Sequence, residues 1–111
     1  MNHGNFIVTL NNEARNAQWS RAGNYILAPN MVNEEKHWLQ QGGTNAMWYS
    51  SCGSWAIGPQ SKIGTCTCGL YAPGDSIGPE TATNWKYANS GWHVSNDNDV
   101  LVELGNTSAV S

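Results

Sequence analysis

Hydrophobic and polar residues alternate in short runs along this chain, and turn residues separate the runs. Alternation with a period of two predicts β-strands that have one buried face and one exposed face. Nine runs have this pattern or are short and apolar: 6–10, 24–28, 36–40, 46–50, 54–58, 66–71, 84–88, 91–95 and 100–104. The pattern predicts a single all-β domain over residues 1–111, built as a small antiparallel β-sandwich or barrel of eight or nine short strands.

Helical signals are weak. Residues 11–18 could form two helical turns with Asn11 or Asn12 as the N-cap, but they carry no apolar stripe that would dock against a core. We therefore expect little or no helix.

Two hairpins can be aligned by matching their apolar faces. In the first, residues 46–50 return as 54–58, and we expect Tyr49 opposite Trp55. In the second, residues 85–88 return as 92–94, and we expect Tyr87 opposite Trp92, which places Lys86 and His93 opposite each other on the solvent face. A shift of one residue would invert these faces. The predicted core is Tyr49, Trp55, Ile57, Trp85, Tyr87, Trp92, Val100 and Val102.

The chain is polar but carries few charges, and it contains six tryptophans. Gly, Asn, Ser and Thr make up 43 of its 111 residues, whereas charged residues make up only 12%. Flat indole rings pack against sugar rings, and amide and hydroxyl groups satisfy sugar hydroxyls. Trp38 and Trp48 do not fall clearly on the apolar face of a strand. They are therefore candidates for stacking on a carbohydrate, with Lys86 and His93 supplying hydrogen bonds and Trp19 as an outlier.

Charge argues against some partners. Five Lys and Arg residues are scattered among eight acids, which leaves a formal net charge of −3, so binding to nucleic acid is not expected. No apolar run approaches the roughly 20 residues of a spanning helix, so membrane insertion is not expected. No secretory signal is recognised either. An extracellular location is favoured only by composition, and homo-oligomerisation through edge strands stays open.

The three cysteines, Cys52, Cys66 and Cys68, leave at least one thiol without an intramolecular partner. Three interpretations stay open. The thiols are all reduced, or Cys52 forms a disulfide with Cys66 or Cys68, or the three cysteines bind a metal together with His37 or His93.

Few residues indicate catalysis or a cofactor. Residues 96–99 gather oxygen ligands, including Asp97 and Asp99, but the ordered pattern of a calcium loop is absent. The chain has no G-x-S-x-G, G-x-G-x-x-G or P-loop motif. We predict no cofactor and no enzymatic activity.

Several motifs carry a resemblance to a known type of module. They are Ala46-Met47-Trp48-Tyr49, Ser54-Trp55-Ala56-Ile57-Gly58, Leu70-Tyr71-Ala72-Pro73-Gly74-Asp75, Trp85-Lys86-Tyr87 and Gly91-Trp92. Together they resemble a small Trp/Gly-rich β module, spanning about residues 24–104, that recurs beside adhesion and lectin-like domains in multidomain proteins of invertebrates and protists. Cys66 and Cys68 depart from that pattern. The resemblance implies recognition or adhesion rather than catalysis.

The sequence thus favours a non-catalytic, lectin-like binding module whose partner is a glycan. The alternative is a structural or protein-interaction module without a small-molecule site. A small metal-binding protein or hydrolase is less favoured.

Overall fold

The computed structural model describes residues 4–73, 77–96 and 98–105. Its nine strands form one antiparallel sheet with the order β8-β7-β6-β5-β4-β3-β2-β1-β9. The strands are β1 (Phe6–Leu10), β2 (Gly23–Val32), β3 (Glu35–Gln40), β4 (Asn45–Tyr49), β5 (Ser54–Pro59), β6 (Leu70–Pro73), β7 (Lys86–Ala88), β8 (Trp92–Val94) and β9 (Val100–Leu104). The predicted all-β fold class is confirmed.

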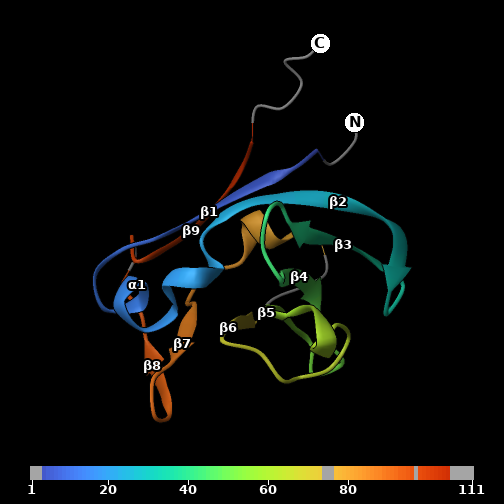
Figure 1. Ribbon diagram of the computed structural model, residues 1–111. Helices are drawn as coiled ribbons and strands as arrows, with labels where there is room; N and C mark the ends of the chain where they lie inside the picture. Colours follow the sequence, from blue (N-terminus) through green and yellow to red (C-terminus); the bar gives the residue numbers. More distant parts are fainter. Residues whose placement is uncertain (1–3, 74–76, 97, 106–111) are drawn as a thin grey trace.

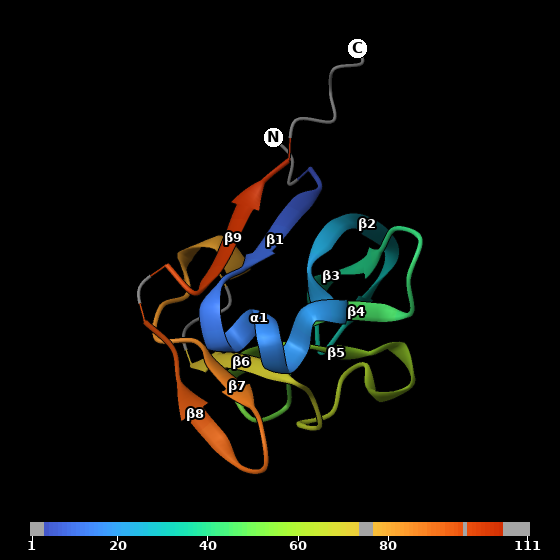
Figure 2. The same ribbon diagram turned by 60° about the vertical axis from the view of Figure 1, so that its left-hand side comes forward.

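The sheet is a meander that curls into a half-barrel (Figures 1 and 2). Strands β1 to β8 follow one another across the sheet, and β9 returns to pair with the free side of β1. The two edges of the sheet are therefore β8 and β9. Three short 3-10 segments lie in the connections: η1 (Trp19–Arg21), η2 (Gln60–Lys62) and η3 (Pro79–Thr81).

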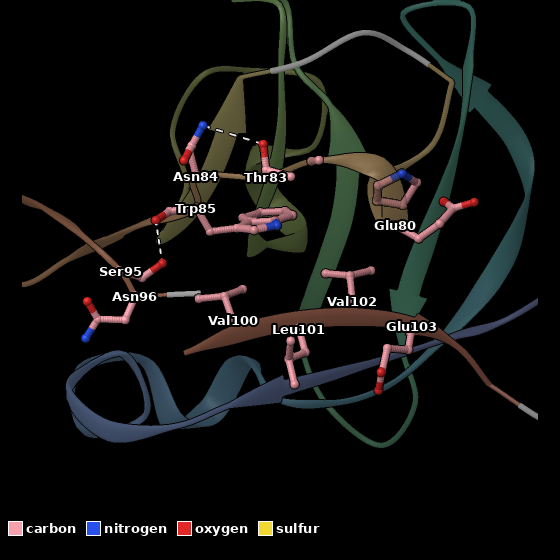
Figure 3. A pocket seen from close by; sticks show the side chains of 12 residues that line it. Glu80, Thr83, Asn84, Trp85, Ser95, Asn96, Val100, Leu101, Val102 and Glu103 are labelled. Atoms are coloured by element: carbon pink, nitrogen blue, oxygen red, sulfur yellow. Dashed lines mark hydrogen bonds between the residues drawn. The ribbon is translucent and has the colours of Figure 1, made fainter. Parts of the chain in front are cut away.

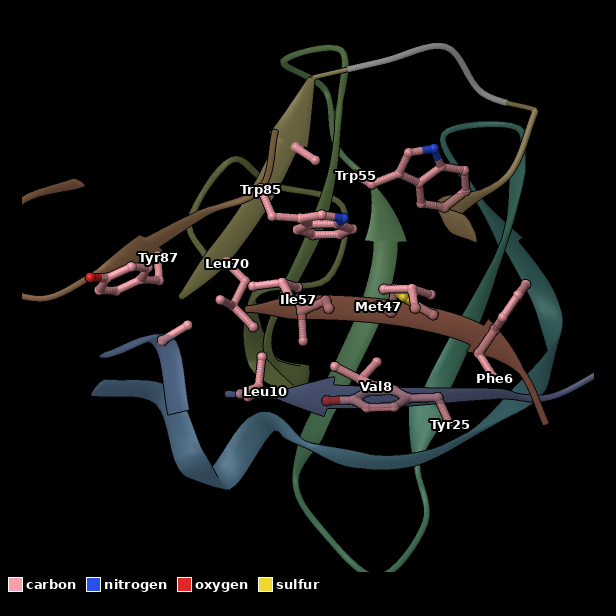
Figure 4. Close-up of a cluster of buried hydrophobic side chains, with 14 of the residues drawn as sticks. Phe6, Val8, Leu10, Tyr25, Met47, Trp55, Ile57, Leu70, Trp85 and Tyr87 are labelled. Atoms are coloured by element: carbon pink, nitrogen blue, oxygen red, sulfur yellow. The ribbon is translucent and has the colours of Figure 1, made fainter. Parts of the chain in front are cut away.

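The main core fills the inner face of the curled sheet (Figure 4). At its centre Trp38 packs edge-on against Phe6, with ring centroids 4.9 Å apart, and lies 6.0 Å from Trp55. Large aromatic rings let a small β domain bury enough apolar surface to fold. Six predicted core residues are buried, namely Trp55, Ile57, Trp85, Tyr87, Val100 and Val102.

The hairpin of β4 and β5 has the predicted register, with Tyr49 opposite Trp55. Their rings meet at a centroid distance of 5.2 Å, and Tyr49 packs against the core while remaining partly exposed. Cross-strand aromatic pairs of this kind fix the register of a hairpin.

A second, smaller core lies on the outer face of β4 and β5. There Trp48 packs with Ala46 and Ala56 beneath the loop of residues 60–68, which contributes Ile63 and Cys68. The indole N–H of Trp48 donates to the carbonyl oxygen of Thr65 at 2.9 Å. The loop approaches so closely that a Cβ at Gly58 would lie 2.8 Å from the Cα of Cys68.

A disulfide between Cys52 and Cys66 fastens this loop to the end of the β4–β5 hairpin. Of the three interpretations open for the cysteines, the structure therefore selects the disulfide to Cys66 and leaves Cys68 as a free thiol. A site that needs all three thiolates is excluded, because two of the sulfurs are bonded to each other.

The short helix α1 (Asn12–Gln18) follows β1, with Asn11 in the N-cap position. It docks through the small side chains of Ala14, which is buried, and Ala17. Alanine contacts need no apolar stripe, which explains why the hydrophobic pattern gave the helix little support.

The hairpin of β7 and β8 differs from its prediction by one residue. Tyr87 lies opposite His93, and Ala88, not Tyr87, lies opposite Trp92. This shift moves Trp92 from the predicted core to the outer face, where its side chain is 47% exposed. The prediction of Trp92 as a core residue is therefore wrong.

Candidate functional site

Two of the predicted sugar-stacking residues lie inside the protein. Trp38 is 1% exposed and Trp48 is 0% exposed, the first in the main core and the second beneath the disulfide-linked loop. The expectation that their rings face solvent is wrong. Trp38 faces inward with Met47, its partner in β4, and Trp48 is covered by the loop between β5 and β6.

The outer face of strands β6 to β8 presents a different aromatic surface. We call Tyr71, Lys86, Trp92 and Val94 the aromatic platform. The strand pairs Tyr71 with Lys86 and Lys86 with Val94 place these three side chains in one row on the face opposite to Leu70 and Tyr87. Trp92 lies two residues before Val94 in β8 and therefore points to the same face.

Contacts within the platform hold Trp92 in place. Its ring meets the ring of Tyr71 at a centroid distance of 4.7 Å and an interplanar angle of 87°. The Nζ atom of Lys86 lies 5.5 Å from the centre of the same Tyr71 ring, within the range of a cation–π contact. The platform therefore combines an exposed indole, a supporting phenol ring and a primary amine.

Sequence reasoning missed Tyr71 and assigned Trp92 to the wrong face. The alternation within β6 was a usable signal for Tyr71, because Leu70 and Ala72 are buried and the residue between them must point outward. The face of Trp92 depended on the register of the hairpin, for which the three-residue loop of Asn89, Ser90 and Gly91 gave no unique solution.

Lys86 and His93 are not neighbours on one face, as the shifted register shows. Lys86 lies on the outer face with the platform, whereas His93 stacks on Tyr87 at a centroid distance of 5.4 Å. The Nε2 atom of His93 also lies 2.8 Å from the carbonyl oxygen of Asn89. The prediction that they face each other is wrong, and a binding role for His93 stays a prediction.

A groove of about 410 Å³ runs along β9 on the side away from β1 (Figure 3). One wall is formed by residues 100–103 of β9, and the other by Trp85 together with Pro79, Glu80 and residues 82–84. Ser95 and Asn96 line one end, and Glu80 and Glu103 lie toward the other (Figure 3). The volume lies in the range of ligand pockets.

The carboxylate of Asp99 has a structural role. It is buried, and it accepts hydrogen bonds from the Nδ2 of Asn12 at 2.8 Å and from the backbone N–H of Asn96 at 3.0 Å. Asp97 lies outside the described residues. Both carboxylate oxygens of Asp99 are thus engaged in holding a turn.

No metal cluster is found in the described part of the chain, where no three His, Cys, Asp or Glu side chains come together. Burial raises the pKa of the Cys68 thiol to about 11, which the nearby Arg21 guanidinium only partly offsets. A thiol with this pKa is a weak nucleophile near neutral pH. His37, the other proposed metal ligand, is buried, and its Nδ1 has no hydrogen-bond partner.

Within the described residues, no helix is long and apolar enough to cross a membrane.

In comparisons with known proteins, no family model, curated protein or solved structure matches this chain. The resemblance to the Trp/Gly-rich module therefore stays a prediction.

Proposed function

We propose that this domain is a non-catalytic, lectin-like binding module and that the aromatic platform is its carbohydrate-contacting surface. The single observation that carries the proposal is the half-exposed ring of Trp92, held edge-on against Tyr71 on an open strand face. An indole in this position loses little conformational freedom on binding, because Tyr71 already restricts it.

The chemistry around Trp92 suits a sugar. The C–H groups on one face of a pyranose ring pack against an indole, while its hydroxyl groups need donors and acceptors. The ammonium group of Lys86 offers three N–H donors and lies over the Tyr71 ring, which supports Trp92. The exposed Asn89 and Ser90 follow in the adjacent loop.

The shape of the platform points to an extended or terminal glycan rather than an enclosed small molecule. The platform lies on an open strand face. Trp92, Tyr71 and Lys86 line neither the groove along β9 nor the hollow beside Asp99, and of the platform residues only Val94 lines that hollow. An open surface of this kind supports recognition, and it offers no enclosed, water-excluding site for chemistry. The disulfide is in keeping with an oxidising, extracellular setting.

A glycan array tests the proposal when it is probed with three proteins: the wild type, Trp92→Ala and Trp19→Ala. Biotin is attached at the C-terminus, because amine-reactive dyes would modify Lys86. We expect the wild type and Trp19→Ala to bind the same related set of glycans, and Trp92→Ala to bind at least about thirtyfold more weakly, as for a residue worth about 2 kcal/mol.

Trp19 is the matched control because its ring is also exposed, at 72%, but lies outside the platform in η1. Lys86→Met should weaken binding by about tenfold, since it retains the packing stem and removes the donor. If folded wild-type protein binds no glycan, the carbohydrate proposal fails and a protein-interaction module becomes the better explanation. If Trp92→Ala binds as tightly as the wild type, the platform is not the site.

A further inference from the structure

The outer edge of β9 presents backbone groups that pair with no other strand among the described residues. In the ladder between β1 and β9, the backbone N–H of Gly105 donates to Asn5, and that of Asn11 donates to Asp99. Hydrogen-bonded pairs alternate along an antiparallel ladder, so residues 99, 101, 103 and 105 direct their backbone groups toward β1. Val100, Val102 and Leu104 therefore direct theirs away from β1.

These outward groups open onto the groove described above. Val100 and Val102 line it, and β9 is the terminal strand of the sheet. Among the described residues, no backbone hydrogen bond joins this edge to the opposite wall around Trp85. Unpaired edge groups of this kind form a template for one more strand.

The free edge of β9 sets the length and spacing of an added strand. An antiparallel strand lies about 4.8 Å from its neighbour and rises about 3.4 Å per residue, so residues 100–104 can pair with a segment of about five residues. The side chains of Val100 and Val102 face the core, where Trp85 forms the far wall (Figure 3). Those of Leu101 and Glu103 face outward.

The negative charge of the groove favours a basic segment as its occupant. Glu80 and Glu103 line it, and Asp99 lines the adjoining hollow, while neither is lined by a Lys, Arg or His side chain. No ion pair neutralises Glu80 or Glu103 within the described part of the chain. A segment with basic residues on its outward face would place a positive charge directly opposite Glu103.

We propose that the β9 groove binds an extended, basic segment of another polypeptide, which pairs with β9 as a tenth antiparallel strand. Its apolar residues lie opposite Val100 and Val102 and exchange backbone hydrogen bonds with them. Its basic residues lie on the outer side with Glu103. This site is separate from the aromatic platform, and neither proposal depends on the other.

The expected pairing with β9 determines which peptide is used as the probe. We choose a capped fluorescent hexapeptide of alternating lysine and valine, in which the valines pair with Val100 and Val102. Methylation of the valine backbone nitrogens removes the donors that face β9, whereas methylation of the lysine nitrogens leaves these donors in place. A peptide with glutamate for lysine is the charge control.

Fluorescence anisotropy should show saturable binding of the lysine peptide. Binding should weaken at least tenfold for the valine-methylated and the glutamate peptides, and much less for the lysine-methylated peptide. Glu80→Gln combined with Glu103→Gln should also weaken it at least tenfold. Glu13→Gln, on the exposed surface of α1, should leave binding unchanged.

Amide hydrogen exchange locates the bound peptide. Saturation with the lysine peptide should slow exchange at Val100 and Val102, while Trp92 and Val94 on the other sheet edge should be unaffected. The proposal is overturned by an absence of binding, by equal binding of the valine-methylated or the glutamate peptide, or by protection at β8 instead. It is also overturned if the free protein is a dimer in which Val100 and Val102 are already protected, because a second copy then occupies the edge.

Discussion

Trp92 stands edge-on to Tyr71, with ring centroids 4.7 Å apart and planes at 87°, although the two residues come from strands that are not neighbours in the sheet. Strand β7 lies between them and contributes only Ala88 opposite Trp92. This small residue leaves room for the indole to reach across to Tyr71. The contact produces an ordered aromatic surface where a hairpin end would otherwise carry a loose side chain.

The six indoles should fall into two classes of solvent access. Trp19 and Trp92 are exposed, whereas the other four are at most 4% exposed. We expect acrylamide to quench the wild type strongly and to quench the double variant Trp19→Phe/Trp92→Phe only weakly. Strong quenching of the folded double variant would mean that Trp38 or Trp48 is accessible after all.

The disulfide should stabilise the second core around Trp48. Cys52 and Cys66 are 14 positions apart, and closing a loop of this size contributes about 3 kcal/mol. The double variant Cys52→Ser/Cys66→Ser should therefore lose about 3 kcal/mol of unfolding free energy in urea. Cys68→Ser is the control, because it leaves the disulfide in place. A melting temperature that does not change when the wild type is reduced would contradict this role.

The turn between β2 and β3 should be improvable. Asn33 and Glu34 both have positive φ, at 54° and 65°, and Val32 pairs with Glu35 around them. A two-residue turn of this kind favours Asn-Gly, because glycine adopts positive φ without strain. Glu34→Gly should raise the unfolding free energy by about 1 kcal/mol.

Glu35→Gly is the matched control for that turn. Position 35 lies in β3, where glycine is expected to destabilise the strand by roughly 0.5–1 kcal/mol. If both glycine variants lower the unfolding free energy, the positive φ of Glu34 does not destabilise the folded protein as we expect.

Acid should destabilise the fold through His37. Burial lowers the pKa of His37, although a backbone hydrogen bond to Asn30 acts in the opposite direction. The unfolded chain therefore takes up a proton at a higher pH than the folded protein does. The unfolding free energy is highest above a pH of about 6.5 and declines as the pH falls, until folded His37 is protonated too.

Melting temperatures at pH 7.5 and 5.5 measure this effect, with His37→Gln and His93→Gln as the two variants. His37→Gln should flatten the pH dependence. His93→Gln, at an exposed position in β8, is the control for replacing a histidine elsewhere in the fold. Equal pH dependence in all three proteins would show that His37 is not responsible.

The pattern of the sequence predicted the strands better than it predicted the site. Local alternation sufficed to predict the pairing of Tyr49 with Trp55, because β4 and β5, the two strands of that hairpin, are both rich in apolar residues. It failed for Trp48, whose cover comes from a loop that a disulfide holds in place. It also failed for Trp92, because apolar character suggests burial and the partner Tyr71 lies two strands away.

The most direct test of the central claim is the set of six indole N–H signals in a ¹H–¹⁵N NMR spectrum of the uniformly labelled protein. The titrants are the glycans selected on the array, or hexasaccharides of β-1,4-linked glucose and N-acetylglucosamine if a fixed panel is used. We expect a saturable shift of the Trp92 signal, with the signals of Trp19, Trp38 and Trp48 unchanged. No shift with any array-selected glycan, or a shift confined to Trp19, would contradict it.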